Sequence, residues 1–241
     1  MRTNPIVRGD LRARLGSAKA IAGYTVFLSL LAVLAILSLP PELGRMQDVR
    51  QQGLLQIFVI AQALFVIYFT SATASGEVAI EGEKAPWDLA ATSFSSAAIA
   101  RGKLLTSAVF AMLLVLLGLP LTAAVAGIRG QGLGAVAASG VVVVAAGAAL
   151  GIWAAVYAAL FESDFARTVV HWLTLLGVVL AAAVLPPPWR LISPVYGVPA
   201  AMSGDTVGVL IALGIYAALA AGGSVALSSR ITAIRREAQA T

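Results

Sequence analysis

Six stretches of the chain are rich in apolar residues and carry no charged side chain between their end residues. They run over 21–39, 54–75, 103–127, 133–160, 169–185 and 207–227. Each is long enough to cross a hydrocarbon core as a helix, although 169–185 is near the lower limit of about 17 residues. A charge at the centre of such a helix costs about 2.5–3.5 kcal/mol on insertion scales. The pattern therefore predicts six transmembrane helices.

The chain before the first stretch has apolar residues at helical spacing. Val7, Leu11 and Leu15 recur at i, i+4 and i+8. The basic residues fall mostly beside that stripe: Arg8, Arg12, Arg14 and Lys19. This spacing is typical of an amphipathic helix whose apolar face lies in the membrane interface. We expect residues 1–20 to form a basic interfacial helix, with a positively charged flank that only fixes topology as the alternative.

The most polar segment, 76–102, separates the second and third stretches. Its charged residues are Glu77, Glu81, Glu83, Lys84, Asp88 and Arg101. Pro86 suits the first turn of a short helix, because its missing N–H has no partner there in any case. Ser95 or Ser96 can cap the helix that becomes the third span.

Prolines mark two further places. The segment 186–206 contains several of them together with Trp189 and Tyr196, which suits a loop at the outer interface and argues against a seventh span. Pro120 lies inside the third stretch and predicts a kink there. A gating hinge at Pro120 is left open.

The composition supports a membrane protein. Of 241 residues, 60% are hydrophobic and 11% are charged, whereas soluble domains average about 45–50% and about 25%. So few charged residues could not cover a globular surface, and so many apolar residues exclude disorder. We expect an all-α integral membrane protein with its transmembrane domain at 21–229 and a tail at 230–241. The absence of cysteine excludes disulfides and thiol chemistry.

Basic residues are distributed unevenly between the two sides of this bundle. Four of the 16 lie on one side, namely Arg45, Arg50, Arg129 and Arg190, and the other twelve lie on the side that carries both termini. Cytoplasmic segments of membrane proteins hold the excess of Lys and Arg. Both termini are therefore predicted to be cytoplasmic. The same asymmetry explains the net charge of +5 without a nucleic-acid partner.

The chain offers little material for catalysis. Gly102-Lys103 lacks the glycine and the Ser or Thr of a phosphate loop, so ATP binding by that device is not expected. Ser139 and His171 fall near opposite ends of adjacent antiparallel spans, which is too far apart for a protease pair. We interpret His171 as a hydrogen-bonded or solvated side chain near the cytoplasmic interface. A protonation switch or substrate contact is the alternative.

The polar segment is similar to a known motif. It runs Glu81-Gly82-Glu83-Lys84-Ala85-Pro86-Trp87-Asp88-Leu89-Ala90-Ala91 and is followed by Gly102-Lys103-Leu104-Leu105. The two runs resemble the signature of ABC-2 type transporter permeases, in which an acidic stretch precedes a Gly-Lys-Leu-Leu entry to the third helix. The opening Asn4-Pro5-Ile6-Val7-Arg8 is similar to the family's N-terminal start. Ile80, Gly82, Pro86 and Ser93 depart from the family pattern.

The resemblance implies the membrane subunit of an ATP-driven exporter in the cytoplasmic membrane of a prokaryote. Such a subunit has no cofactor of its own, because ATP and Mg²⁺ bind to two separate cytoplasmic ABC ATPase subunits. A second permease, identical or a paralogue, would complete the transporter within the membrane lipid. The residues that the resemblance puts on or beside the coupling helix of loop 76–102 are Glu81, Glu83, Lys84, Pro86, Trp87 and Asp88.

Two other functions stay open. A non-transporting membrane scaffold or assembly subunit would share the six-helix bundle. A secondary transporter is a weaker alternative, because no acid within a span offers an ion-coupling site. The substrate is open among lipids, hydrophobic drugs, peptides and polymers, since the spans combine aliphatic residues with Ser, Thr and Gly.

Overall fold

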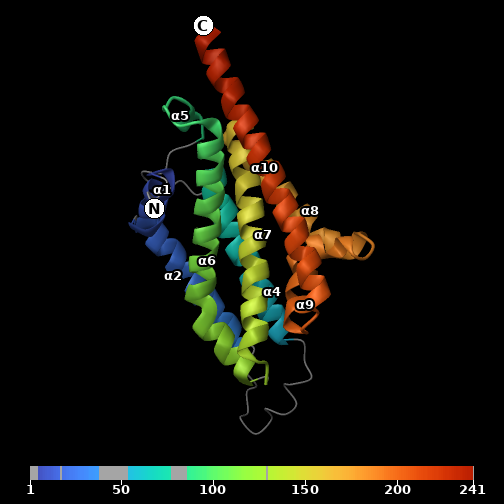
Figure 1. Ribbon diagram of the computed structural model, residues 1–241. Helices are drawn as coiled ribbons and strands as arrows, with labels where there is room; N and C mark the ends of the chain where they lie inside the picture. Colours follow the sequence, from blue (N-terminus) through green and yellow to red (C-terminus); the bar gives the residue numbers. More distant parts are fainter. Residues whose placement is uncertain (1–4, 17, 38–53, 77–85, 129, 241) are drawn as a thin grey trace.

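The structure is a computed structural model that describes residues 5–16, 18–37, 54–76, 86–128 and 130–240 (Figure 1). All regular secondary structure in these residues is helical. The long helices are α2 (Ala18–Leu37), α4 (Leu54–Ser75), α6 (Ser96–Ile128), α7 (Leu133–Leu160), α8 (Asp164–Val184) and α10 (Thr206–Ala240). The short ones are α1 (Pro5–Gly16), α5 (Pro86–Ala90), the 3₁₀ helix η2 (Trp189–Ile192) and α9 (Pro194–Met202).

Five of the long helices are individually long and apolar enough to cross a membrane. These are α4, α6, α7, α8 and α10. The pair α1 and α2, bent by 66° at the break between them, would count as a sixth if taken as one span. The prediction of an all-helical chain with several membrane-spanning helices is thus confirmed, with five or six candidate spans among the described residues. Residues 38 and 39, the end of the first predicted span, lie outside the described residues.

The helix ends differ from the predicted spans where polar residues continue a helix. The bounds of α4 and α7 equal the predicted 54–75 and 133–160. In contrast, α10 extends past residue 227 to Ala240. No glycine or proline interrupts 228–240, so this polar sequence keeps a helical preference after its apolar character ends.

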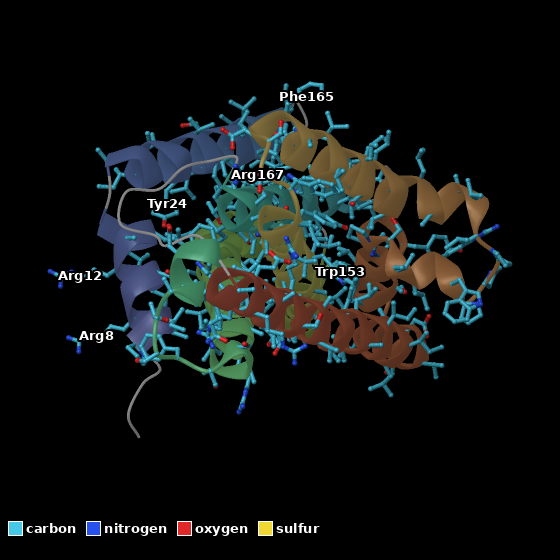
Figure 2. All side chains as sticks on the ribbon, turned by 90° about the horizontal axis from the view of Figure 1, so that it is seen from above. Arg8, Arg12, Tyr24, Trp153, Phe165 and Arg167 are labelled. Atoms are coloured by element: carbon cyan, nitrogen blue, oxygen red, sulfur yellow. The ribbon has the colours of Figure 1, made fainter. Side chains whose placement is uncertain are left out.

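The core is built around α7. Helices α4, α6 and α10 pack on it from different sides (Figure 1). Inside the protein, 61% of the apolar window of α7 is buried, against 6% for α8. Helix α8 runs along the edge of the molecule, where Phe165 near its start is 79% exposed (Figure 2). An apolar surface of this kind suits contact with lipid chains.

Small residues allow α6 and α7 to approach each other closely. A Cβ added at Gly151 would lie 2.6 Å from Ser107 Oγ, and one at Gly147 would lie 2.9 Å from Ala111 Cβ. Gly147 and Gly151 form the Gly-x-x-x-Gly of the fourth predicted span. Because neighbouring backbones can approach where no side chain intervenes, this pattern sets the α6–α7 contact.

Helix α10 crosses α7 at another glycine. A Cβ at Gly223 would lie 2.8 Å from Ile152 Cγ2. One turn earlier on α10, the Leu219 carbonyl accepts a hydrogen bond from Trp153 Nε1 at 3.0 Å. A hydrogen bond between α10 and α7 therefore lies one turn from their close contact at Gly223.

The segment 186–206 is more ordered than the loop predicted for it. It contains η2 and α9, and α9 packs on α7, α4 and α10 with Val198 and Ala201 buried. The Ser193 hydroxyl accepts from Val195 N at 3.3 Å, and Pro194 occupies the first helical position. These start signals nucleate a nine-residue helix that is too short to cross a membrane. Tyr216 on α10 donates to Ile192 O at 2.9 Å and holds the segment in place.

Candidate functional site

The predicted coupling residues lead to one end of the bundle. Pro86 is the first residue of α5, as its helix-starting character predicts, and Trp87 and Asp88 follow it. Asp88 is exposed, and the side chains of the two residues before it lie outside the described part of the chain. Glu81, Glu83 and Lys84 also lie outside the described residues. The structure thus provides the helix that would carry this motif and one of its charged side chains.

We name this region the α5 end. It comprises α5, the turn 91–95, the first turns of α6 and the last turns of α10, which lie together in Figure 1. Ser95 Oγ accepts a hydrogen bond from Ala98 N at 3.2 Å, so Ser95 is the cap that starts α6. This settles the choice between Ser95 and Ser96.

Arg235 joins α10 to the end of α5. Its Nε donates to Ala90 O at 2.8 Å, and its Nη2 donates to Thr92 O at 3.0 Å and Phe94 O at 2.5 Å. Carbonyls at the end of a short helix have no intrahelical partner and carry partial negative charge. One guanidinium therefore satisfies three acceptors of the α5 end at once.

A second contact joins α10 to the start of α6. The Thr232 hydroxyl lies 2.9 Å from Ser96 Oγ, one turn before Arg235. Together with the arginine, it ties the polar part of α10 to both the turn 91–95 and α6. Helix α10 is thus bonded to the α5 end at two successive turns.

An apolar cluster underlies these polar contacts. It combines buried residues of α1, α5, α6, α7 and α10, among them Ile6, Leu89, Ile99, Ile152 and Ile231. The cluster is separate from the main core, which lies further along the bundle. Because close-packed side chains transmit displacement rather than absorb it, α5 is mechanically connected to three long helices.

The buried face of α1 differs from the predicted stripe. Val7 is buried as expected, but Leu11 is half-buried and Leu15 is 49% exposed. Asp10 and Arg14 occupy the buried positions instead. The exposed side of Leu15 stays available to the membrane interface predicted for this stripe, whereas Asp10 and Arg14 face the partners that α6 and α2 offer.

Charged and aromatic residues of α6 and α2 receive this face of α1. Lys103 Nζ lies 2.8 Å from Asp10 Oδ2, and each side chain is only 5% exposed. The Arg14 guanidinium carbon lies 4.9 Å from the centre of the Phe110 ring. The Tyr24 hydroxyl donates to Arg14 O. An ion pair and a cation–π contact thus dock α1 on α6.

Arg14 and Lys103 counted toward the topology of the chain, and Asp10 was assigned no role. Two local signals were present: Asp10 is an acid in an otherwise basic helix, and Lys103 stands at the edge of an apolar stretch. For Arg235 there was no local signal, because its acceptors are backbone carbonyls more than a hundred residues away in the sequence.

The single histidine lies away from the α5 end contacts. His171 Nε2 is 2.7 Å from Ser71 Oγ, and its ring stacks on Tyr68. The side chain is only 2% exposed, so it is hydrogen-bonded as interpreted but not solvated. Ser139 donates to Val136 O at 2.8 Å. Within the described residues, no group of three His, Asp or Glu side chains could hold a metal ion.

Comparison with known proteins adds no further assignment: no protein-family model, curated protein or solved structure matches the chain.

Proposed function

We propose that the chain is the membrane subunit of an ABC exporter of the ABC-2 type, and that α5 receives force from a separate ATPase. The observation that supports this proposal is the anchoring of α5. A five-residue helix would be a poor transmitter by itself, yet Arg235 bonds its end to α10, and Leu89 packs with Ile231 and Ile99. A push on α5 would therefore act on the long apolar helices.

The distribution of basic residues indicates on which side of the membrane the ATPases would act on α5. The α5 end lies on the side of the bundle that carries twelve of the 16 basic residues, which is the side predicted to be cytoplasmic. Two ATPase subunits that bind ATP and Mg²⁺ would dock there and close on each nucleotide. Closure would displace α5, and α6 and α10 would shift between two packed arrangements of the bundle.

A second permease copy or a paralogue would form the other half of the pathway. Such an assembly would lie in the cytoplasmic membrane, with both chain termini on the ATPase side. ATP chemistry would occur in the partner subunits, since the phosphate-loop pattern is missing from this sequence.

Purification from native membranes tests the assignment. We expect the tagged full-length chain to retain a Walker-motif ATPase in mild detergent, and the reconstituted pair to hydrolyse ATP faster than the ATPase alone. Binding of an ATPase without ATP-dependent transport would favour the scaffold function. Transport driven by an ion gradient without any ATPase would favour a secondary transporter.

Two variants test the role of the coupling segment. Trp87→Ala and Glu83→Arg should uncouple ATP hydrolysis from transport while leaving membrane insertion intact. Matched controls are Trp189→Ala and Glu162→Arg, because both positions are exposed and lie outside α5 and loop 76–102. Wild-type transport in both coupling variants would contradict the assignment of α5.

A further inference from the structure

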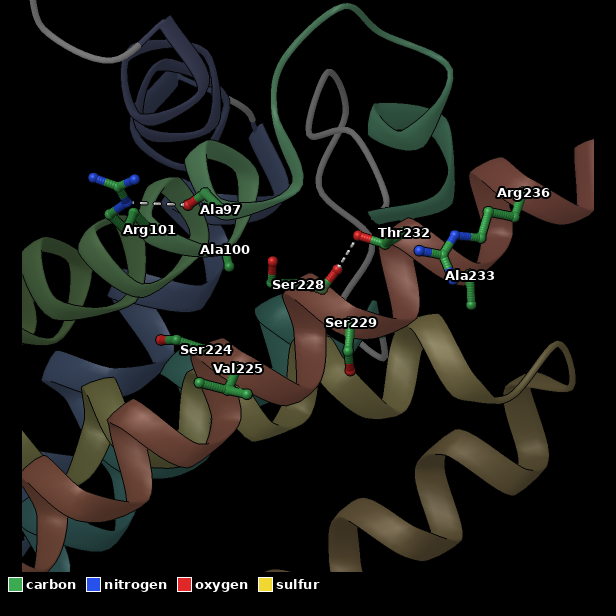
Figure 3. A pocket seen from close by; sticks show the side chains of 10 residues that line it. All are labelled: Ala97, Ala100, Arg101, Ser224, Val225, Ser228, Ser229, Thr232, Ala233 and Arg236. Carbon is green, nitrogen blue, oxygen red and sulfur yellow. Dashed lines mark hydrogen bonds between the residues drawn. The ribbon is translucent and has the colours of Figure 1, made fainter. Parts of the chain in front are cut away.

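A pocket opens between α6 and α10 beside the α5 end contacts (Figure 3). Its volume is about 570 Å³. Ala97, Ala100 and Arg101 contribute from α6, and Val225, Ser228 and Arg236 are among the residues that contribute from α10. Small side chains create the hollow, since alanine and serine leave space where the two helices diverge.

Arg101 and Arg236 place positive charge at the two ends of the pocket (Figure 3). Arg101 Nε donates to Ala97 O at 3.3 Å, which leaves its terminal Nη atoms for a ligand. Arg236 is exposed and forms no ion pair with a described residue. The half-buried Ser228 adds a hydroxyl to the same wall. One guanidinium with a nearby hydroxyl matches the oxygens of a phosphate group, and the second arginine adds attraction for an anion from the other end of the pocket.

The lower part of the pocket is apolar. Ala97, Ala100 and Val225 line it, and the apolar stretches of the two helices begin at 103 and end at 227. The pocket therefore spans the level at which hydrocarbon gives way to polar surroundings. A free phosphate would use only the polar side chains, whereas a phospholipid would use them for its headgroup and the apolar wall for its glycerol and acyl chains.

We propose that this pocket binds the phosphate headgroup of an anionic phospholipid. Basic pockets between transmembrane helices attract such headgroups, because each cation near the surface adds favourable energy where the membrane is negative. Helices α6 and α10 are also the two that hold the turn 91–95. A lipid seated between them would fix their separation at this level.

Lipid displacement on the purified full-length chain tests the proposal. The probe is a fluorescent phosphatidylglycerol in mild detergent, displaced by unlabelled phosphatidylglycerol, by phosphatidylcholine or by inorganic phosphate. We expect phosphatidylglycerol to displace it at concentrations at least about fivefold lower than zwitterionic phosphatidylcholine, and inorganic phosphate to have little effect. Equal displacement by the two lipids would overturn the proposal. Displacement by inorganic phosphate alone would assign the polar side chains to a free anion and would also overturn it.

Two double variants distinguish a specific lipid site from non-specific electrostatic attraction of the lipid to the protein. Arg101→Gln with Arg236→Gln should weaken phosphatidylglycerol binding by about 25-fold, or about fivefold for each charge. The matched control is Arg8→Gln with Arg12→Gln, which removes the same net charge from two side chains that point away from the molecule (Figure 2). Equal weakening in both double variants would show diffuse electrostatics and overturn the proposal.

A third variant keeps both arginines and tests whether the space between α6 and α10 is needed for lipid binding. Ser228→Leu fills the pocket and should weaken lipid binding about tenfold. Circular dichroism and elution volume report whether each variant is folded. Unchanged binding in folded Ser228→Leu would contradict a lipid seated between α6 and α10.

Discussion

At the scale of single residues, the ion pair between α1 and α6 has an asymmetric energetic consequence. Asp10 and Lys103 lie 2.8 Å apart, and each is only 5% exposed. The cost of removing two charges from water roughly cancels their attraction, so the pair adds little net stability. Losing one partner is different, because the remaining charge stays buried without compensation.

This asymmetry predicts the outcome of a double-mutant cycle. Lys103→Met or Asp10→Leu alone should lower the free energy of unfolding by about 3 kcal/mol, whereas the double variant should recover most of that loss. Unfolding of the purified full-length chain in detergent measures each value. Arg12→Gln on the exposed face of α1 is the control and should change little. Additive losses in the double variant would contradict the buried pair.

Arg235 and Arg236 are neighbours with different surroundings, which makes them a matched pair. Arg235→Ala removes three donors from the carbonyls of the α5 end. Amide hydrogen exchange over 88–96 should then become about tenfold faster, because a lost bond of this kind is worth about 1–2 kcal/mol. Arg236→Ala should leave exchange in that segment unchanged. Equal acceleration in both variants would show that Arg235 does not hold the segment.

At the scale of elements, a helix could be predicted from the sequence where lipid surrounds it, and its orientation could not be predicted where it depends on residues far away in the chain. The spans could be read from the chain because lipid requires apolar residues along the whole length of a helix. The orientation of α1 could not, because Asp10 becomes a buried residue only when Lys103 lies opposite it. Segment 186–206 was predicted as a loop because of its prolines, although Ser193 and Pro194 are local start signals for α9, and packing on α7 and α10 then stabilises this helix.

The candidate site likewise has features that follow from the local sequence and contacts that do not. Pro86 as the start of α5 was predicted from local chemistry, and so was a serine cap of α6, for which the sequence left Ser95 and Ser96 open. The bonds from Arg235 to the turn 91–95 depend on the path of α10 past the end of α5. Sequence spacing contains no information on that path.

The α6–α7 contact predicts a paired substitution. Gly151→Ala should destabilise the chain, since the added Cβ would lie 2.7 Å from Ser107 Cβ, and Ser107→Gly in the same chain should restore much of the loss. We expect about 1–3 kcal/mol for the single change, the usual cost of overpacking. Gly177→Ala on α8 is the control, because nothing lies within 4 Å of the added atom. There the change should be neutral or slightly stabilising.

At the scale of the whole molecule, the fold places the polar ends of its longest helices together. The α5 end has charged anchors and a separate apolar cluster, whereas the exposed aromatic residues Trp189 and Tyr196 belong to segment 186–206, away from that end. In the predicted orientation the basic end would face the cytoplasm.

Cysteine labelling tests that orientation directly. The natural sequence contains no cysteine, so a single introduced thiol gives an unambiguous signal. In intact cells a membrane-impermeant maleimide should label Ser203→Cys and should reach Gln239→Cys only after permeabilisation. Both positions are exposed and lie at opposite ends of the fold. The reverse labelling pattern would invert the predicted topology.

Under the proposed push on α5, helix α10 would act as a lever about the glycine at which it crosses α7. Gly223 lies against Ile152, and Trp153 bonds to the preceding turn, so this crossing would be the fulcrum. At a rise of about 1.5 Å per residue, Arg235 is about 18 Å from the fulcrum and Thr206 about 26 Å on the other side. A tilt of about 10° would move the near arm by about 3 Å and the far arm by about 4 Å. A small stroke applied at α5 would thus be enlarged at the opposite face of the membrane.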